Sequence, residues 1–296
     1  MSGRSVLAVA LLALLAGVAS YWLFLVHPER VVEHAPLAAP ETLLLSAMSG
    51  GVEIAGPDGV WRAATPGERL SPRQRIRTDE DGEAELRAAD GSTVRLSNAT
   101  DARVDELRRE LKRLSLSAGQ LTADVPDDPT RVFEVAVDGQ GGVARTRGAR
   151  FTADVGKNGA AAVATHRGEV ILSARGKEVV IRSGQFARLA PGGVPGAPEP
   201  LPQSLFLKVA WPKPLGNKKR VAVSGLTAPN ARVKVAGHFV SVNADGTYRD
   251  ELELEDGSHE IEVHASDLAG HVVDEKSPRI VIDTKTDFKV HPPKWE

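Results

Sequence analysis

The sequence predicts an all-β protein with an apolar N-terminal helix, and three observations carry this prediction. Short alternating stretches rich in valine and threonine recur between glycine-bearing turns over residues 42–284. Proline-rich stretches divide the chain, and an uncharged run opens it. At 296 residues, the chain is long enough for two domains that each bury their own core.

These features divide the chain into six expected parts. They are a membrane anchor or signal peptide over 1–27, a spacer over 28–41, a first β domain over 42–189, a Pro/Gly linker over 190–203, a β-sandwich over 204–284 and a tail over 285–296. The linker alone carries five prolines, which is typical of a domain boundary.

The N-terminal run Ser5–Val26 contains no charged residue. A helix of this length spans roughly 33 Å, slightly more than the ~30 Å hydrocarbon core of a bilayer. With only four residues before the run, we expect the chain to cross a membrane once, with its N-terminus cytoplasmic and its bulk exported. The small residues Val18–Ser20 leave a cleaved signal peptide as the alternative, and export follows either way.

Composition limits the chemistry of the exported part. The formal net charge of −2 provides no field that would draw the chain onto nucleic acid. The absence of cysteine excludes disulfides, thiolate metal sites, a cysteine nucleophile and a lipidated cysteine.

The stretch from Arg75 to Leu96 shows how the first domain is expected to fold. Ala84 and Leu86 share one face of a predicted strand, and Val94 and Leu96 share a face of the next. Asp81-Gly82 and Asp90-Gly91 are expected to supply the positive φ angles that reverse the chain.

Two further patterns bear on this domain. Residues 104–114 place leucines at helical spacing, so a short helix competes with strand there, and we favour strand or irregular structure because alternation resumes at once. Gly119-Gln120 and Gly184-Gln185 form a weak internal echo in which each pair is expected to end a strand, indicating a winding with repeated corners.

The most specific residues of the first domain are Gly67 with Arg77-Thr78, and Asp90-Gly91-Ser92, followed by LSLSAGQLTADV, RVFEVAV and RGARFTADV. In this order they resemble the FecR-type periplasmic domain over about residues 43–189. At Gly148-Ala149 this chain departs from the Gly-Thr usual in that family. The resemblance implies a solenoid- or barrel-like β-winding and a role in envelope signal transduction or in assembling an envelope complex.

Regulatory members of that family carry a cytoplasmic segment of some eighty residues that holds a sigma factor. This sequence has four residues before its apolar run. We therefore do not expect this chain to capture a sigma factor, and a signalling role would need a partner that spans the membrane.

The second domain shows strand patterns separated by Asp-Gly turns. Val221 and Val223 begin a strand, Asp245-Gly246 closes a hairpin, and Leu252 and Leu254 point inward. Over about residues 201–283 this stretch resembles the Ig-like modules related to the glucodextranase B-domain. About seven strands in some ninety residues suit a β-sandwich.

Motifs that suggest chemistry have simpler explanations. Residues 139–144 match the letters of a dinucleotide fingerprint, but no helix follows, so turn glycines are favoured. Asp79–Gly82 resembles half of a calcium loop without its remaining oxygen ligands, which favours a solvated turn. His259 and His264 are expected on opposite faces of one strand and therefore bind no shared metal.

Surface features leave two binding alternatives open. The basic cluster Lys218–Arg220 is read as a solvated loop, with contact to an anionic glycan or lipid head group as the alternative. Trp61, Trp211 and Trp295 suggest a sugar-stacking platform, although Trp61 lies between apolar neighbours and is expected in the core.

The sequence thus assigns no catalytic, cofactor-binding or metal-binding residue, and it identifies no binding residue. We expect a non-enzymatic, membrane-anchored, FecR-like periplasmic protein that senses or transduces an envelope signal, or serves as a protein-binding scaffold, and that needs no cofactor. Expected partners are envelope proteins and, through the N-terminal helix, the inner membrane. The alternative is a module that binds cell wall or polysaccharide.

Overall fold

The computed structural model describes residues 41–137, 141–156, 159–213, 215–216, 219–229, 231–243 and 245–284. The expected anchor, its cleavage site, nearly all of the spacer and the tail lie outside these residues. Within them, no helix has the length and apolar character needed to span a membrane. The described residues are all-β, fall within one compact unit and form an N-terminal module (residues 41–200) and a C-terminal module (residues 201–284).

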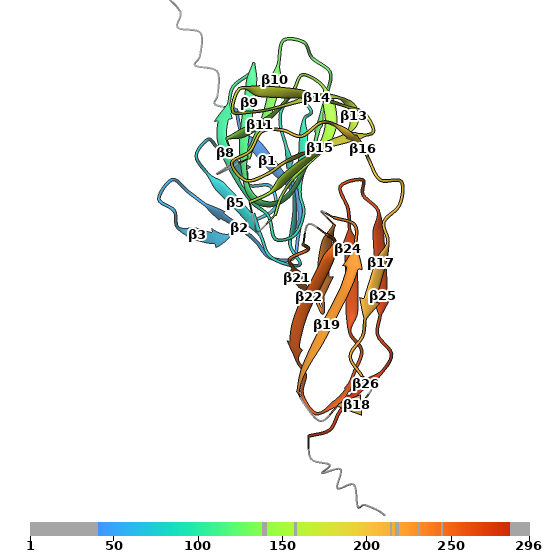
Figure 1. The fold of residues 1–296 in the computed structure, drawn as a ribbon. Helices are drawn as coiled ribbons and strands as arrows, with labels where there is room; N and C mark the ends of the chain where they lie inside the picture. The colour runs from blue at the N-terminus through green and yellow to red at the C-terminus, as the bar shows by residue number, and fades with distance from the viewer. Residues whose placement is uncertain are drawn as a thin grey trace, which may run out of the picture. The chain divides into compact units, whose positions relative to one another are not determined.

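The N-terminal module is built from two sheets that share two long strands (Figure 1). Sheet I contains, in ladder order, β4 (Arg69–Leu70), β1 (Leu43–Ser49), β6 (Glu83–Arg87), β7 (Thr93–Leu96), β9, β12 (Ala149–Val155), β13, β15 (Gln185–Leu189) and β16 (Glu199–Pro200). Sheet II contains β3 (Trp61–Ala63), β2 (Val52–Ala55), β5 (Arg75–Thr78), β8 (Asp101–Leu107), β9, β10 (Val132–Val137), β11 (Gly142–Thr146), β13 and β14 (Lys177–Arg182).

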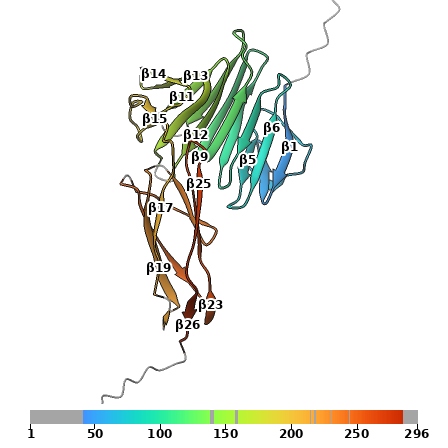
Figure 2. The same cartoon turned by 90° about the vertical axis from the view of Figure 1, so that its right-hand side faces the viewer.

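The shared strands are β9 (Leu111–Val125) and β13 (Ala161–Ala174). The first part of β9 pairs with β8 and β10 in sheet II, and from Gly119 onward the strand pairs with β12 in sheet I. Strand β13 makes the opposite change at Gly168, leaving β12 for β14. Figure 2 shows β9, β12 and β13 running beside one another.

Each change of sheet occurs at a glycine with a positive φ, +85° at Gly119 and +77° at Gly168. Both glycines also lie against backbone: a Cβ on Gly119 would come within 2.4 Å of the Ala99 carbonyl oxygen, and one on Gly168 within 2.4 Å of the Gly148 carbonyl oxygen. The prediction that each glycine–glutamine pair ends a strand is therefore wrong for the first pair and correct for the second. Gly119 lies inside a strand that bends, whereas Gly184 lies in the turn between β14 and β15.

One hydrophobic core fills the space between the two sheets. Leu86, Val94, Leu96 and Phe151 from sheet I join Ile76, Val104, Leu114, Phe133 and Val135 from sheet II. The rings of Phe133 and Phe151 meet edge to face across the core, with centroids 6.3 Å apart. The predicted inward faces of Ala84–Leu86 and Val94–Leu96 are confirmed, and residues 104–114 contain strand and no helix.

The turn at Asp81-Gly82 differs from its prediction. Gly91 has the expected positive φ and closes the β6–β7 hairpin, but Gly82 does not. Gly82 is required because a Cβ there would meet the Gly51 carbonyl oxygen at 2.1 Å. The turn carries the chain from β5 in sheet II to β6 in sheet I, so it joins two sheets rather than two paired strands.

The C-terminal module is a β-sandwich with its own core. One sheet contains β17 (Leu207–Ala210), β19 (Arg220–Thr227) and β22 (Thr247–Glu253); another contains β21 (His238–Val240), β20 (Arg232–Val235), β24 (Glu262–Ser266) and β25 (Val272–Lys276); a short third contains β18 (Leu215–Gly216), β26 (Ile280–Ile282) and β23 (Gly257–His259). Val223, Val233 and Val263 are fully buried among them. Leu252 is buried and Leu254 packs on this core, as the sequence predicts.

Replacing Gly119 by alanine tests the corner of β9. The alanine would add backbone strain of about 1–2 kcal/mol and, because it meets the Ala99 carbonyl, a further overpacking cost of about 1–3 kcal/mol. The matched control is Gly176→Ala, which has the same sign of φ (+77°) but open space at its Cβ. Chemical unfolding of the full chain is expected to show the larger loss for Gly119→Ala; equal losses would mean that the corner tolerates a side chain.

Candidate functional site

Cross-strand ion pairs lie on the outer face of sheet II. On sheet II, Glu134 accepts hydrogen bonds from Arg113 and Arg145 on the strands to either side, and Arg77 pairs with Glu53. These cross-strand pairs suit a face exposed to water.

Part of the outer face of sheet I carries short side chains. We call Thr122, Thr152, Ala162 and Ala164 the alanine–threonine face, since they occupy neighbouring positions on β9, β12 and β13. The two threonine hydroxyls lie 2.9 Å apart, and the Thr152 hydroxyl also lies 3.0 Å from Nε2 of His166. Ala162 and Ala164 are buried although they point away from the core, because Phe186 of β15 and Leu268 of the C-terminal module cover them.

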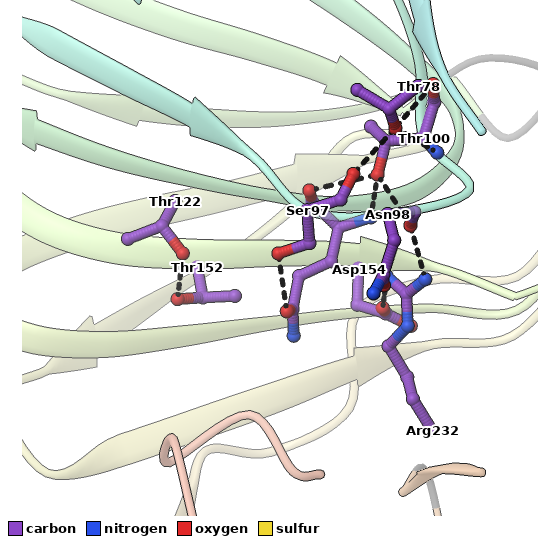
Figure 3. A network of polar contacts seen from close by, with 9 residues as sticks. Thr78, Ser97, Asn98, Thr100, Thr122, Thr152, Asp154 and Arg232 are labelled. Atoms are coloured by element: carbon purple, nitrogen blue, oxygen red, sulfur yellow. Dashed lines mark hydrogen bonds and ion pairs between the residues drawn. The ribbon is translucent and has the colours of Figure 1, made fainter. Parts of the chain in front are cut away.

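A polar network lies where β9 bends beside this face (Figure 3). The Thr78 hydroxyl donates to the Ser97 carbonyl at 2.7 Å and accepts from the Thr100 N–H at 2.9 Å. The Thr100 hydroxyl in turn accepts from the Gln120 N–H at 3.0 Å, and the Ser97 hydroxyl donates to the Gln120 amide oxygen at 3.2 Å. Buried hydroxyls that are fully paired in this way fix the loop at residues 97–100 against the bend.

Arg232 of the C-terminal module enters this network. Its Nη2 donates to the Asn98 carbonyl at 2.7 Å, and its Nη1 lies 3.6 Å from a carboxylate oxygen of Asp154. Figure 3 shows the guanidinium between these two groups. Both side chains are largely buried, with 12% of Arg232 and 15% of Asp154 exposed, and the guanidinium lies over the ring of Phe239 at 4.6 Å.

Burial changes the titration of this pair. It raises the pKa of the Asp154 carboxyl to about 6, against the attraction of Arg232, which acts in the opposite direction. Burial likewise lowers the pKa of Arg232, although the charge of Asp154 opposes this. Removing the Asp154 carboxylate from water costs more than the attraction of Arg232 returns. The pair therefore contributes little to stability.

A second polar contact joins the two modules at the turn Asp79–Gly82. The ammonium of Lys234 donates to the Glu80 carbonyl, and Nδ1 of His238 lies 2.9 Å from the Glu80 carboxylate. The turn expected to be solvated is therefore a contact point. It lines a shallow, solvent-open pocket of about 580 Å³, and a second open pocket of about 550 Å³ lies beside Arg232, Asp154 and Phe239.

Other residues singled out from the sequence lie elsewhere. The expectation that Trp61 is in the core is wrong: it lies half-buried on β3 with the guanidinium of Arg77 at 4.2 Å and that of Arg75 at 5.3 Å from its ring. Trp211 packs partly buried against the second core, and Trp295 lies outside the described residues. The structure therefore brings together no tryptophan platform among the residues it describes.

The histidine and basic clusters also separate. His259 and His264 lie on two strands rather than one, near the Glu255 carbonyl and Asp274 respectively. Lys219 pairs with Glu255, while Lys218 lies outside the described residues. Over the part of the chain that the structure covers, no three potential ligands among His, Asp and Glu gather as a metal site would require.

The fingerprint-like residues 139–144 fall partly outside the described residues. Gly141 has a positive φ, and Gly142 begins strand β11. A strand at this point is incompatible with the helix that a dinucleotide-binding loop must open.

Comparisons with known proteins match both modules. A family model described as FecR protein matches residues 74–171, and one described as glucodextranase, domain B, matches residues 212–284. Both resemblances inferred from the sequence are thereby confirmed. The FecR match fits envelope signal transduction, and it runs from β5 into β13, so it includes both bent strands.

Solved structures show only distant likeness. A candidate anti-sigma factor from Parabacteroides distasonis is 14% identical, with a TM-score of 0.39, over 48% of this chain and 68% of that one. Fibronectin(III)-like modules of CbhA from Clostridium thermocellum are 14% identical, with a TM-score of 0.26, over 65% of this chain and 100% of that one. No curated protein matches the sequence.

The residues most specific to the FecR resemblance are structural in this chain. Gly67 has a φ of +86° and donates to the Leu45 carbonyl, and Asp90 accepts from the Ser92 N–H and pairs with the buried Lys112. Thr78 belongs to the corner network. The contact residues Asp154 and Arg232 were missed, because each occupies an ordinary outward position in an alternating strand.

Replacing Thr100 by valine tests the corner network. The Gln120 N–H would lose its partner at a buried site, which is expected to lower the free energy of unfolding by about 1–3 kcal/mol. The control is Thr130→Val, at an exposed turn where the hydroxyl donates only to Asp128, with an expected loss below about 1 kcal/mol. Chemical unfolding measures both; a Thr100 loss no larger than that of Thr130 would show that the network does not hold the corner.

Proposed function

We propose that this chain is a non-enzymatic, FecR-like component of the bacterial envelope that acts by binding a protein partner. The observation that carries the proposal is the FecR match over residues 74–171. It is supported by the placement of the most specific FecR residues in turns and in the corner network, where they shape a surface and form no reactive cluster.

In this proposal the N-terminal module carries the binding surface. The N-terminal module carries the alanine–threonine face, which accepts an apolar side chain, and beside it Asp154 and the Asn98 carbonyl, which accept a guanidinium. Held near the inner membrane by the apolar run Ser5–Val26, this face would meet membrane partners at a raised local concentration, so that weak contacts suffice. Signal transduction then passes through a partner that spans the membrane.

Crosslinking in living cells tests the requirement for a protein partner. The full chain and a variant lacking residues 204–284 are expected to capture the same envelope protein, because the FecR-type module carries the contact. A variant that joins residues 1–41 directly to the C-terminal module is the control and is expected to lose it. Capture that follows the C-terminal module instead would overturn this assignment.

A second candidate function is polysaccharide binding, which the match to glucodextranase domain B favours. It predicts that the purified chain is retained on insoluble cell wall or glucan and released by soluble glycan. Retention that survives removal of residues 42–189, together with no captured protein in the crosslinking experiment, would favour this function over partner binding.

Membrane anchoring is part of the proposal and has its own test. In a Gram-negative host, the chain is expected to remain in the membrane fraction after alkaline carbonate extraction, because an uncharged helix of this length stays in the bilayer. External protease added to spheroplasts should degrade residues 42–284. Recovery of a shortened, soluble periplasmic chain would identify Ser5–Val26 as a cleaved signal peptide.

A further inference from the structure

The contact between the modules is small in its apolar part. Leu268 packs on Ala162, Ala164 and Phe186, with Leu201 beside them, and this cluster is separate from both cores. Because each module buries its own core, separating them would expose the cluster without opening either core.

The polar part of the contact is loosely held. Nη1 of Arg232 has no hydrogen-bond partner among the described residues and lies 3.6 Å from Asp154, longer than a charge-assisted hydrogen bond. Two solvent-open pockets of about 550 and 580 Å³ flank the contact. A buried ion pair with this geometry contributes more to orientation than to stability.

Arg232 and Leu268 lie at the same end of the C-terminal module, where β20 begins and β24 ends. Arg232 lies opposite Ser266 in the β20–β24 pair, and Leu268 follows two residues after Ser266. The face they meet thus recognises a guanidinium and a branched aliphatic side chain presented side by side. It does so through the Asn98 carbonyl, the Asp154 carboxylate and the small residues of the alanine–threonine face.

We propose that the C-terminal module docks reversibly on the alanine–threonine face through Arg232 and Leu268. The uncovered face then binds a protein partner that presents a guanidinium beside a branched aliphatic side chain. The C-terminal module and the partner thus compete for the same site. The second half of this proposal rests on the proposed function; the first half does not.

The docking half is tested on the purified full chain without any partner. Because the chain has no cysteine, Lys177→Cys and Glu251→Cys place one label on an exposed site of each module. Pulsed electron spin resonance then measures the distance distribution between the labels. We expect a narrow docked population, which becomes broad and longer in Arg232→Gln and in Leu268→Ala.

The matched control is Arg182→Gln, which removes an exposed arginine that pairs only with Glu169 of its own module. Its distance distribution should equal that of the unsubstituted chain. Thermal unfolding of each variant checks that both cores remain folded. Identical distributions for the unsubstituted chain, Arg232→Gln and Leu268→Ala would overturn reversible docking whether or not a partner exists.

Acidity provides a second measurement on the same labels. Burial in the docked state raises the pKa of Asp154 to about 6, so the docked state binds a proton more tightly than an undocked state in which the carboxyl is exposed. Protonation therefore favours docking. Between about pH 7 and about pH 5, the ratio of docked to undocked chains is expected to rise about tenfold.

Other charged groups near Asp154 must be separated from this effect. Arg232 faces it from β20, and Arg188 lies in the same row of sheet I, across Ala162. On β9 the opposite residue is the uncharged Gln120. His166 has a pKa lowered by burial and by Arg150, whereas Asp267 of the C-terminal module acts in the opposite direction. In Asp154→Asn, the ratio of docked to undocked chains should no longer rise on acidification. A rise that persists would show that Asp154 does not control docking.

The partner half is tested in cells with a photo-crosslinking residue at Arg95, an exposed position opposite Thr122 at the rim of the face. Capture of the partner found with the proposed function is expected to increase several-fold in Arg232→Gln relative to Arg182→Gln. If that partner is captured through other surfaces and capture at Arg95 is unchanged, the face is not its site, even though the proposed function stands.

Discussion

The structure depends on two strands that each serve two sheets. Without cysteines, the N-terminal module has no covalent crosslink, and its two sheets are joined within single strands at Gly119 and Gly168. At each bend the alternation of side chains shifts by one residue. On β9 the inward positions change from Leu114 and Leu116 to Leu121, and on β13 they change from Val163 to Val170 and Leu172. The residues on both sides of each bend still enter the same core. The chemistry of the outer faces follows from this register.

The bend at Gly119 also positions the candidate site. The loop at residues 97–100 is held against the bend by Thr78, Thr100 and Gln120, and it presents the Asn98 carbonyl outward. Asp154 lies opposite Gln120 in the next strand of sheet I. A single local constraint on the backbone therefore places both acceptors that meet Arg232.

The sequence predicts local structure here better than long-range contact. Alternation correctly indicates the strands and their buried residues, because both are set within a few residues. It reads LKRLSLSAGQLTADV as one alternating stretch. The odd spacing between the buried Leu116 and Leu121 marks a break at Gly119 but does not reveal which strands pair on either side of it. Trp61 shows the same limit: apolar neighbours suggested burial, whereas edge strand β3 leaves its ring among arginines. Asp154 and Arg232 carry no local signal, because their burial depends on residues far along the chain.

The short side chains of the alanine–threonine face explain why Leu268 packs on this part of sheet I. On sheet II, long arginine and glutamate side chains already satisfy each other, so a partner would have to break those pairs before binding. Sheet I carries similar pairs at Glu85 and Asp124, but on its alanine–threonine face the side chains are short and the carboxylate of the neighbouring Asp154 is only partly compensated. Short side chains leave apolar area to be covered, and the buried acid beside them needs a cation. A partner that supplies both an apolar side chain and a cation therefore binds this surface best. The C-terminal module supplies both, through Leu268 and Arg232.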